Sequence, residues 1–138
     1  MTDPEIRVAE WLSPLLEALG HPAAADMIER RLQRLAANPN AIVLVLSVDR
    51  AVEGLATAHM FETIHAEAPA AWITALVVST AARRRGVGSG LVRALERWAQ
   101  ERGAVRISVN SGAHRADAHA FYEGIGFIAN GKRFSRAL

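Results

Sequence analysis

Three arginines and three alternating glycines follow one another between Arg83 and Gly90 (RRRGVGSG). An apolar run at 71–79 precedes them, and a segment with helical spacing begins at Val87. The first N–H groups of a helix have no partner within the helix and carry partial positive charge. Glycine lets a phosphate approach these groups without a Cβ in the way. Together with the charge of the arginines, the pattern predicts a site for a phosphorylated anion.

Two common phosphate-binding motifs do not fit this segment. The dinucleotide motif has the spacing G-x-G-x-x-G after the first strand of a βαβ unit, whereas the spacing here is G-x-G-x-G, late in the chain. A Walker loop needs Gly-Lys followed by Ser or Thr, and Lys132 is the only lysine of the chain. The local pattern leaves one alternative open, in which the glycines only form a tight turn and the arginines are solvated surface.

The charges of the 138-residue chain are divided unevenly between its two halves, although the formal net charge is only +2. Residues 1–80 hold 5 arginines against 10 acidic residues, and residues 81–138 hold 11 basic against 4 acidic residues. Such an asymmetry indicates that the second half meets an anion. The chain has no cysteine, which excludes disulfides, thiolate metal sites and a cysteine nucleophile.

The elements that must position the glycine segment follow from the hydrophobic spacing. Gly54 indicates a bulge or a close backbone approach in the strand that contains it. The order of elements predicts an α+β fold, in a single domain that covers residues 1–138. Helices are expected at 8–19, 22–37, 87–102 and 116–123, and strands at 5–8, 41–48, 52–64, 71–79, 105–109, 127–129 and 133–136, the last two joined by an Asn130-Gly131 turn.

Targeting and metal-binding signals are weak in this sequence. No apolar stretch reaches the roughly 18 residues of a spanning helix, and the N-terminus lacks the apolar core of a signal peptide. We therefore expect a soluble, cytoplasmic protein without a membrane partner. His114 and His119 have a spacing that suits a metal site poorly, so no metal is expected.

Two segments together resemble the GNAT acetyltransferase superfamily. Arg83-x-x-Gly86-x-Gly88, five residues after Val78, is similar to the family's acetyl-CoA-binding motif, and AHAFYEGIGF at 118–127 is similar to its A-x-x-F-Y-x-x-x-G-F segment. The resemblance covers residues 41–138 well. It implies a central mixed, mostly antiparallel, twisted sheet of about six to seven strands flanked by four helices. It also implies a splayed cleft between the strands at 71–79 and 105–110.

The resemblance further implies that acetyl-CoA is the co-substrate. In the family, a bulge in the strand before the glycine turn opens the cleft, and the pantetheine arm pairs with backbone groups there. The N–H of Val77 would polarise the thioester carbonyl, and the pyrophosphate would lie on the N–H groups of residues 84–90. The implied cofactor-binding residues are Leu76, Val77, Val78, Arg83, Arg84, Arg85, Gly86, Val87, Gly88, Ser89, Gly90, Asn110 and Tyr122.

Tyr122, the only tyrosine of the chain, stands where the resemblance implies a general acid that protonates the departing CoA thiolate. A tyrosine pKa near 10 lies above a thiol pKa of about 8.5, so the proton would move in the required direction. The alternative is an aromatic core residue. Relatives often carry Asn where this chain has Arg115, and Asn110 can replace that contact.

The general base and the acceptor are left open by the sequence. Some relatives carry a catalytic Glu on the strand at 71–79, which has no acid here, so the base is Glu62, His65, Glu67 or water. Without a thiol to carry the acetyl group, we expect direct attack by the primary amine of a small molecule in a ternary complex. The alternatives are acetylation of a protein N-terminus or lysine, and an acyl-CoA-binding module without catalysis. A nucleic-acid partner is not expected, because the basic half lacks interleaved aromatic residues. The sequence leaves open whether the protein forms a homodimer.

Overall fold

The structure is a computed structural model and describes residues 12, 14–17, 23–48, 51–83, 85–110 and 116–138. The chain divides into two compact units, Met1–Ser108 and Val109–Leu138. The expected strand at 5–8 lies outside the described residues, as does most of the first expected helix. Of that helix, residues 12 and 14–17 are described and are helical. The single domain over residues 1–138 stays a prediction.

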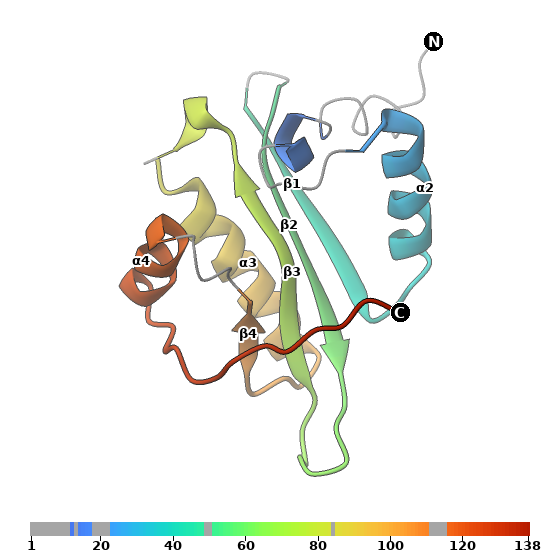
Figure 1. Cartoon of the computed structure of the whole chain (residues 1–138), viewed down its shortest axis with the longest axis vertical. Helices are drawn as coiled ribbons and strands as arrows, with labels where there is room; N and C mark the ends of the chain where they lie inside the picture. Colours follow the sequence, from blue (N-terminus) through green and yellow to red (C-terminus); the bar gives the residue numbers. More distant parts are fainter. Residues whose placement is uncertain (1–11, 13, 18–22, 49–50, 84, 111–115) are drawn as a thin grey trace. The chain divides into compact units, whose positions relative to one another are not determined.

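The first unit is built on a sheet whose strands follow one another in chain order, β1-β2-β3-β4 (Figure 1). The strands β1 (Ala41–Val48), β2 (Ala51–Phe61) and β3 (Ala70–Val78) pair antiparallel, and β4 (Ile107–Val109) is a short addition beside β3. The first three strands lie within three residues of the predicted bounds, because apolar and β-branched runs specify buried strands strongly.

Two β-bulges interrupt the pairing of the long strands. Glu53 is the extra residue of β2 in its pairing with β1, and Thr74 is the extra residue of β3 in its pairing with β2. A bulge bends its strand and changes the direction of nearby side chains. The predicted irregularity at Gly54 is thus confirmed, and so is the bulge that the family resemblance implied in the strand before the glycine turn.

Helices cover both faces of the sheet. On one face, the helix α2 (Ala25–Ala36) and the helical residues 12 and 14–17 pack on a core of Leu12, Leu15, Ile28, Val52, Leu55 and Val77. The helix α3 (Val87–Glu101) covers the other face. Neighbouring strand residues face opposite sides of a sheet, so Gly54 faces α3 while the next residue, Leu55, faces α2. The side chains of α3 that are buried are Leu91, Val92, Leu95, Trp98 and Ala99.

The second unit contains the helix α4 (Ala116–Gly124), at the predicted position. The two strands predicted at 127–129 and 133–136 are wrong, because residues 127–138 form no strand and residues 128–138 are all exposed. The Asn130-Gly131 pair is a local hairpin signal, but a two-stranded hairpin that buries no apolar face is only marginally stable. The described residues therefore form four strands rather than six to seven.

Candidate functional site

The glycine turn connects the end of β3 to the start of α3. Ser79 follows β3, the one-turn helix η1 (Thr80–Ala82) comes next, and Gly86 is the N-cap residue of α3. Gly86 has a φ of 75°, in the left-handed region that a residue with a Cβ seldom adopts. This position of the motif therefore requires glycine for the backbone itself.

The N-terminus of α3 offers several N–H groups to an anion. The first intrahelical bond runs from the N–H of Gly90 to the carbonyl of Gly86, at 2.9 Å. The N–H groups of Val87, Gly88 and Ser89 precede it and have no acceptor within the helix. Because the first turn of α3 holds no acidic residue, no side-chain charge of that turn opposes an anion at this end of the helix dipole.

Arg93 adds a positive charge to this turn that the sequence analysis did not assign to the site. Its Nη1 donates a hydrogen bond of 2.9 Å to the Oγ of Ser89, so the guanidinium lies back over the first turn of α3. The spacing of four residues between the two on one helix face was the signal that could have found this pair. The side chains of Arg83 and Arg85 are exposed, and Arg84 lies outside the described residues.

The entry to the turn is held by Glu53, another residue that the sequence analysis missed. The hydroxyl of Ser79 donates to the Oε2 of Glu53 and accepts from the N–H of Ala82 at 3.3 Å. The N–H of Ser79 also donates to the carbonyl of Glu53, at 2.8 Å. Because 26 residues separate the two, no local pattern of the sequence could reveal the contact.

The pairing of β3 with β2 decides which backbone groups of β3 face away from β2. Ser79 and Glu53 form a hydrogen-bonded pair, and Leu55 lies opposite Val77 two residues further along. Hydrogen-bonded and non-bonded pairs alternate along an antiparallel ladder. The N–H of Val77 is therefore directed at β2, and those of Leu76 and Val78 are directed at the other edge of β3.

That other edge is covered only in part by β4. The N–H of Ala71 donates to the carbonyl of Arg106 at 2.9 Å, which places the beginning of β4 beside the beginning of β3. From Ala71 to Leu76 the strand extends about 16 Å, whereas three residues of β4 extend about 10 Å. Among the described residues, β4 is thus too short to accompany β3 as far as Leu76 and Val78.

Two hydroxyl groups stand at the bulge of β3, close to Leu76 in the sequence. The Oγ1 atoms of Thr57 and Thr74 are 2.6 Å apart. Thr74 belongs to the segment in which some relatives carry an acid, and a hydroxyl pair can hold a water or an amine but cannot serve as a base at neutral pH.

The three residues expected as candidate bases lie at the other end of the β2–β3 hairpin. Glu62, His65 and Glu67 are exposed, in the connection between Phe61 and Ala70. About 13 Å of strand separates Ala70 from the bulge at Thr74, and about 20 Å separates it from Leu76, so these side chains lie at the far end of the strand from an amine that would attack beside Leu76.

Tyr122 belongs to the second unit and packs among aromatic rings. Its ring lies 5.2 Å from that of Phe121 and 5.6 Å from that of Phe127, both with edge-to-face geometry. The N–H of Phe127 donates to the carbonyl of Tyr122 at 2.9 Å, which closes the end of α4. The ring is half-buried among these aromatic neighbours. The general-acid role of its hydroxyl stays a prediction, as does the role of Asn110, which is exposed after β4.

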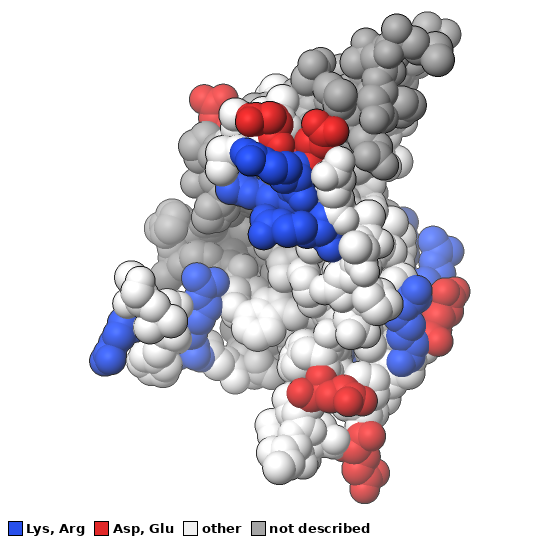
Figure 2. Space-filling view, turned by 90° about the vertical axis from the view of Figure 1, so that its right-hand side faces the viewer, with Lys and Arg blue, Asp and Glu red and all other residues white. Residues whose placement is uncertain are grey.

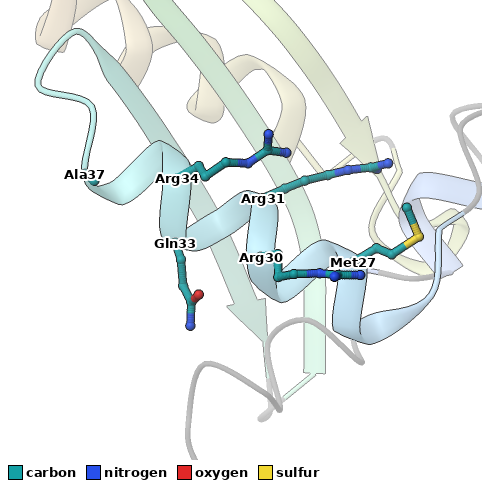
Figure 3. A pocket seen from close by; sticks show the side chains of 6 residues that line it. All are labelled: Met27, Arg30, Arg31, Gln33, Arg34 and Ala37. Atoms are coloured by element: carbon teal, nitrogen blue, oxygen red, sulfur yellow. The ribbon is translucent and has the colours of Figure 1, made fainter.

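An open hollow lies on the outer surface of α2, which faces the viewer in Figure 2 and is enlarged in Figure 3. It is lined by Met27, Arg30, Arg31, Gln33, Arg34 and Ala37. Arg30 is 3.6 Å from the carboxylate of Asp26, and both side chains are largely exposed. The lining residues come from α2 and its C-cap residue Ala37, on the face of the sheet opposite to α3, so this hollow is separate from the glycine turn.

Metal-binding clusters and membrane-spanning helices are both absent among the described residues. No three His, Asp or Glu side chains among them gather closely enough to hold a metal ion. No helix in the part of the chain that the structure describes has the length and apolar character needed to cross a membrane.

Comparisons with known proteins agree with this fold. The model of the Acetyltransferase (GNAT) family matches residues 6–127, and the chain therefore belongs to the GNAT family of acetyltransferases. It is 32% identical over 132 residues to YhdJ of Bacillus subtilis (strain 168), an uncharacterized N-acetyltransferase, and the match covers 94% of this chain and 92% of that protein. This membership identifies the chain as an acetyltransferase enzyme.

Solved structures with the same fold include two acetyltransferases. A GNAT family acetyltransferase of Staphylococcus aureus subsp. aureus USA300_TCH1516 superposes with a TM-score of 0.83 at 21% identity, over 100% of this chain and 95% of that one. The aminoglycoside acetyltransferase meta-AAC0020 from an uncultured soil metagenomic sample, in complex with sisomicin, superposes with a TM-score of 0.80 at 23% identity, over 100% and 93% of the two chains. At these identities the likeness establishes the fold.

Proposed function

We propose that this enzyme transfers the acetyl group of acetyl-CoA to the primary amine of a small molecule. The observation that carries the proposal is the N-terminus of α3, where Gly86 has a left-handed backbone and Arg93 lies back over the first turn. Helix N–H groups and arginine side chains are the donors that phosphates require. GNAT family membership supplies the reaction class.

The pyrophosphate of acetyl-CoA lies on the N–H groups of Val87, Gly88 and Ser89 in this proposal. The N–H of Gly90 is already donated to Gly86, so we leave it out of the expected set. Arg83, Arg84 and Arg85 supply charge around the turn, and Arg93 joins them. The hydroxyl of Ser89 accepts from Arg93 and keeps its own hydrogen for a phosphate oxygen.

The edge of β3 directed away from β2 binds the pantetheine arm, and acetyl-CoA supplies the activated thioester. The resemblance to the family implied the N–H of Val77 at the thioester carbonyl. Because the strand pairing directs that N–H at β2, we propose the N–H of Leu76 as the oxyanion donor instead. The side chain of Val77 is 7% exposed and belongs to the core beneath α2, so its role is to fix the strand.

The hydroxyl of Tyr122 protonates the departing thiolate, a role carried over from the family's aromatic motif. For the incoming amine, the bulge of β3 offers the hydroxyls of Thr57 and Thr74, and the one acid of β2 and β3, Glu53, is bonded to Ser79 instead. We therefore propose that water takes the proton of the amine, with these hydroxyls holding that water or the amine itself. Among similar proteins, an aminoglycoside acetyltransferase in complex with sisomicin supports a small-molecule amine as the acceptor class.

The proposal is tested by binding first and turnover second. Acetyl-CoA at about 100 times its dissociation constant should stabilise the protein by about 2.7 kcal/mol, which a thermal shift titration measures. A panel of primary amines with detection of released CoA thiol then identifies the acceptor. If acetyl-CoA produces no shift at millimolar concentration, the proposal fails.

Replacing the tyrosine separates the catalytic role from binding. Tyr122→Phe keeps the ring contacts with Phe121 and Phe127 and removes only the hydroxyl. General acid catalysis contributes about 10²–10⁴-fold, so turnover should fall strongly while the dissociation constant of acetyl-CoA stays the same. Unchanged turnover would exclude Tyr122 as the acid, but it would not contradict the proposal that the enzyme binds acetyl-CoA.

A further inference from the structure

Two neighbouring residues of β2, Glu53 and Gly54, contact the two ends of the glycine turn. Glu53 contacts Ser79, where the turn leaves β3. Gly54 faces Val87 and Leu91, where the turn enters α3. Between these ends the chain has only η1 and the residues up to Gly86. Two consecutive residues of β2 thus contact both the beginning and the end of the glycine turn, the segment proposed to bind the phosphates.

The contact at the entry is made possible by the bulge at Glu53. As the extra residue of β2 against β1, Glu53 departs from the regular alternation of the strand. Its carbonyl accepts from the N–H of Ser79 and its carboxylate accepts from the hydroxyl of the same residue. The hydroxyl in turn accepts from the N–H of Ala82. The carboxylate therefore fixes the rotamer of the serine that caps η1, through a charge-assisted hydrogen bond.

The contact at the exit depends on the missing side chain of Gly54. A Cβ at this position would lie 3.0 Å from Cδ1 of Leu91 and 3.2 Å from Cγ1 of Val87. Both distances are shorter than ordinary van der Waals contacts, which begin near 3.5 Å. Cδ1 of Leu91 ends a flexible side chain that can turn aside, but Val87 is β-branched and stiff at χ1, so a Cβ on Gly54 would press on the first turn of α3. Glycine lets this turn approach the sheet closely.

We infer that Glu53 and Gly54 are positioning residues that fix the glycine turn at the distance from the β3 edge that acetyl-CoA requires. The inference rests on the proposed function. The pyrophosphate and the pantetheine arm belong to one molecule, so the N–H groups of α3 and the edge of β3 must be correctly spaced to bind both at once. Binding sites need such groups within about 0.5 Å of the productive position, and β2 supplies that precision from outside the motif.

The first test compares three variants of the entry contact by calorimetric titration of acetyl-CoA. Glu53→Leu and Ser79→Ala remove the hydrogen bond and should each weaken acetyl-CoA binding by about tenfold, the equivalent of about 1.4 kcal/mol for a bond to a charged group. Glu53→Gln keeps an oxygen that can accept from Ser79 and should recover most of the affinity. Glu29→Leu, on α2, removes the same charge away from the turn and should bind as the wild type does.

A second ligand distinguishes positioning from general loss of structure. S-acetylpantetheine carries the thioester and the arm without the pyrophosphate, and its binding can be measured by ligand-observed NMR. Displacement of the glycine turn should leave its affinity unchanged in Glu53→Leu, whereas a damaged sheet would weaken both ligands.

The exit contact is tested by a pair of compensating substitutions. Gly54→Ala should weaken acetyl-CoA binding several-fold and leave S-acetylpantetheine unaffected. Val87→Ala removes the γ-carbon that the new Cβ meets and keeps the backbone N–H. The double variant Gly54→Ala/Val87→Ala should therefore bind acetyl-CoA more tightly than Gly54→Ala alone.

The outcomes separate the inference from the proposed function. A wild-type protein that binds no acetyl-CoA overturns the proposed function and this inference with it. If the wild type binds acetyl-CoA and the Glu53→Leu and Gly54→Ala variants bind it with the same affinity as the wild type, the inference is overturned and the proposed function is not. Equal losses for acetyl-CoA and S-acetylpantetheine would also overturn it, because the two residues would then support the sheet rather than the turn.

Discussion

Arg93 contributes to the candidate site although it lies outside the motif that defines the site. Its guanidinium bonds to Ser89 in the first turn of α3, and its Nη2 would be 3.9 Å from a Cβ on Gly90. The charge is therefore held beside the N–H groups that we expect to bind phosphate, at a position where the helix dipole is also positive. Without an anion this arrangement places like charges together, and a bound pyrophosphate would compensate them.

We predict that Arg93→Gln weakens acetyl-CoA binding by about two- to fivefold. This is the effect of losing an exposed ion pair worth about 0.5–1 kcal/mol, and calorimetry measures it. Arg97→Gln is the matched control, because Arg97 is exposed on the same helix one turn further on. Equal losses in the two variants would show a general charge effect and would remove Arg93 from the site.

The two edges of β3 have different roles. One edge pairs with β2 and holds the strand in the sheet, and the other presents the N–H groups of Leu76 and Val78 beyond the reach of β4. The bulge at Thr74 lies just before this stretch. Proline tests the assignment directly, because it removes one N–H and is tolerated in a sheet only where that N–H has no ladder partner.

Leu76→Pro and Val77→Pro should therefore have opposite consequences. Leu76→Pro loses no bond to β2, so it should stay folded, while turnover falls by about 10²–10³-fold for a lost oxyanion donor. Val77→Pro leaves a carbonyl of β2 without its donor, at a cost of about 1–3 kcal/mol. Thermal unfolding and thiol release measure the two effects. Equal destabilisation would contradict the edge assignment, and a folded Leu76→Pro variant with full turnover would exclude that N–H.

Elements that bury apolar residues could be predicted from the sequence, and those held by contacts distant in sequence could not. The run at 41–48 gave β1 at the predicted bounds, and the apolar stripe from Leu91 to Trp98 gave α3. The strand predicted to begin at Val105 begins at Ile107 instead, since Val105 is 82% exposed and buries no apolar surface in the sheet. The C-terminal hairpin failed for the same reason, since Phe134 is 90% exposed and pairs with no strand.

The candidate site divides in the same way. The glycines and their role in the turn were readable, because a positive φ at Gly86 and a helix start at Val87 are local properties. Gly54 indicated a bulge in β2, but the bond between Glu53 and Ser79 joins residues 26 positions apart, and no local pattern of the sequence predicts that pairing. The choice between Leu76 and Val77 depends on hydrogen-bond register, which a sequence of apolar residues does not encode.

The charge difference between the halves of the chain does not describe the surfaces of the folded molecule. Residues 1–80 carry a net negative charge, yet α2 in this half gathers Arg30, Arg31 and Arg34 on its outer surface, where Figure 2 shows basic side chains. Figure 3 shows Arg31 and Arg34 extending from the same side of the helix. The net charge of this half thus does not predict the charge of each of its surfaces, and charge has to be assigned surface by surface.

The basic surface of the glycine turn makes a prediction that net charge cannot make. Arg83, Arg85 and Arg93 are exposed, and their attraction for a pyrophosphate is screened as the Debye length falls from about 10 Å at 0.1 M salt to about 3 Å at 1 M. Acetyl-CoA should therefore bind progressively more weakly as sodium chloride is raised, and S-acetylpantetheine, which lacks the pyrophosphate, should not. Calorimetry at a series of salt concentrations measures acetyl-CoA binding, and ligand-observed NMR measures S-acetylpantetheine binding.

Arg93→Gln should show a shallower salt dependence than the wild type, while Arg31→Gln, on the basic surface of α2, should match the wild type. A dissociation constant for acetyl-CoA that does not change with salt would mean that hydrogen bonds from the α3 backbone, and not the arginines, account for binding at this turn.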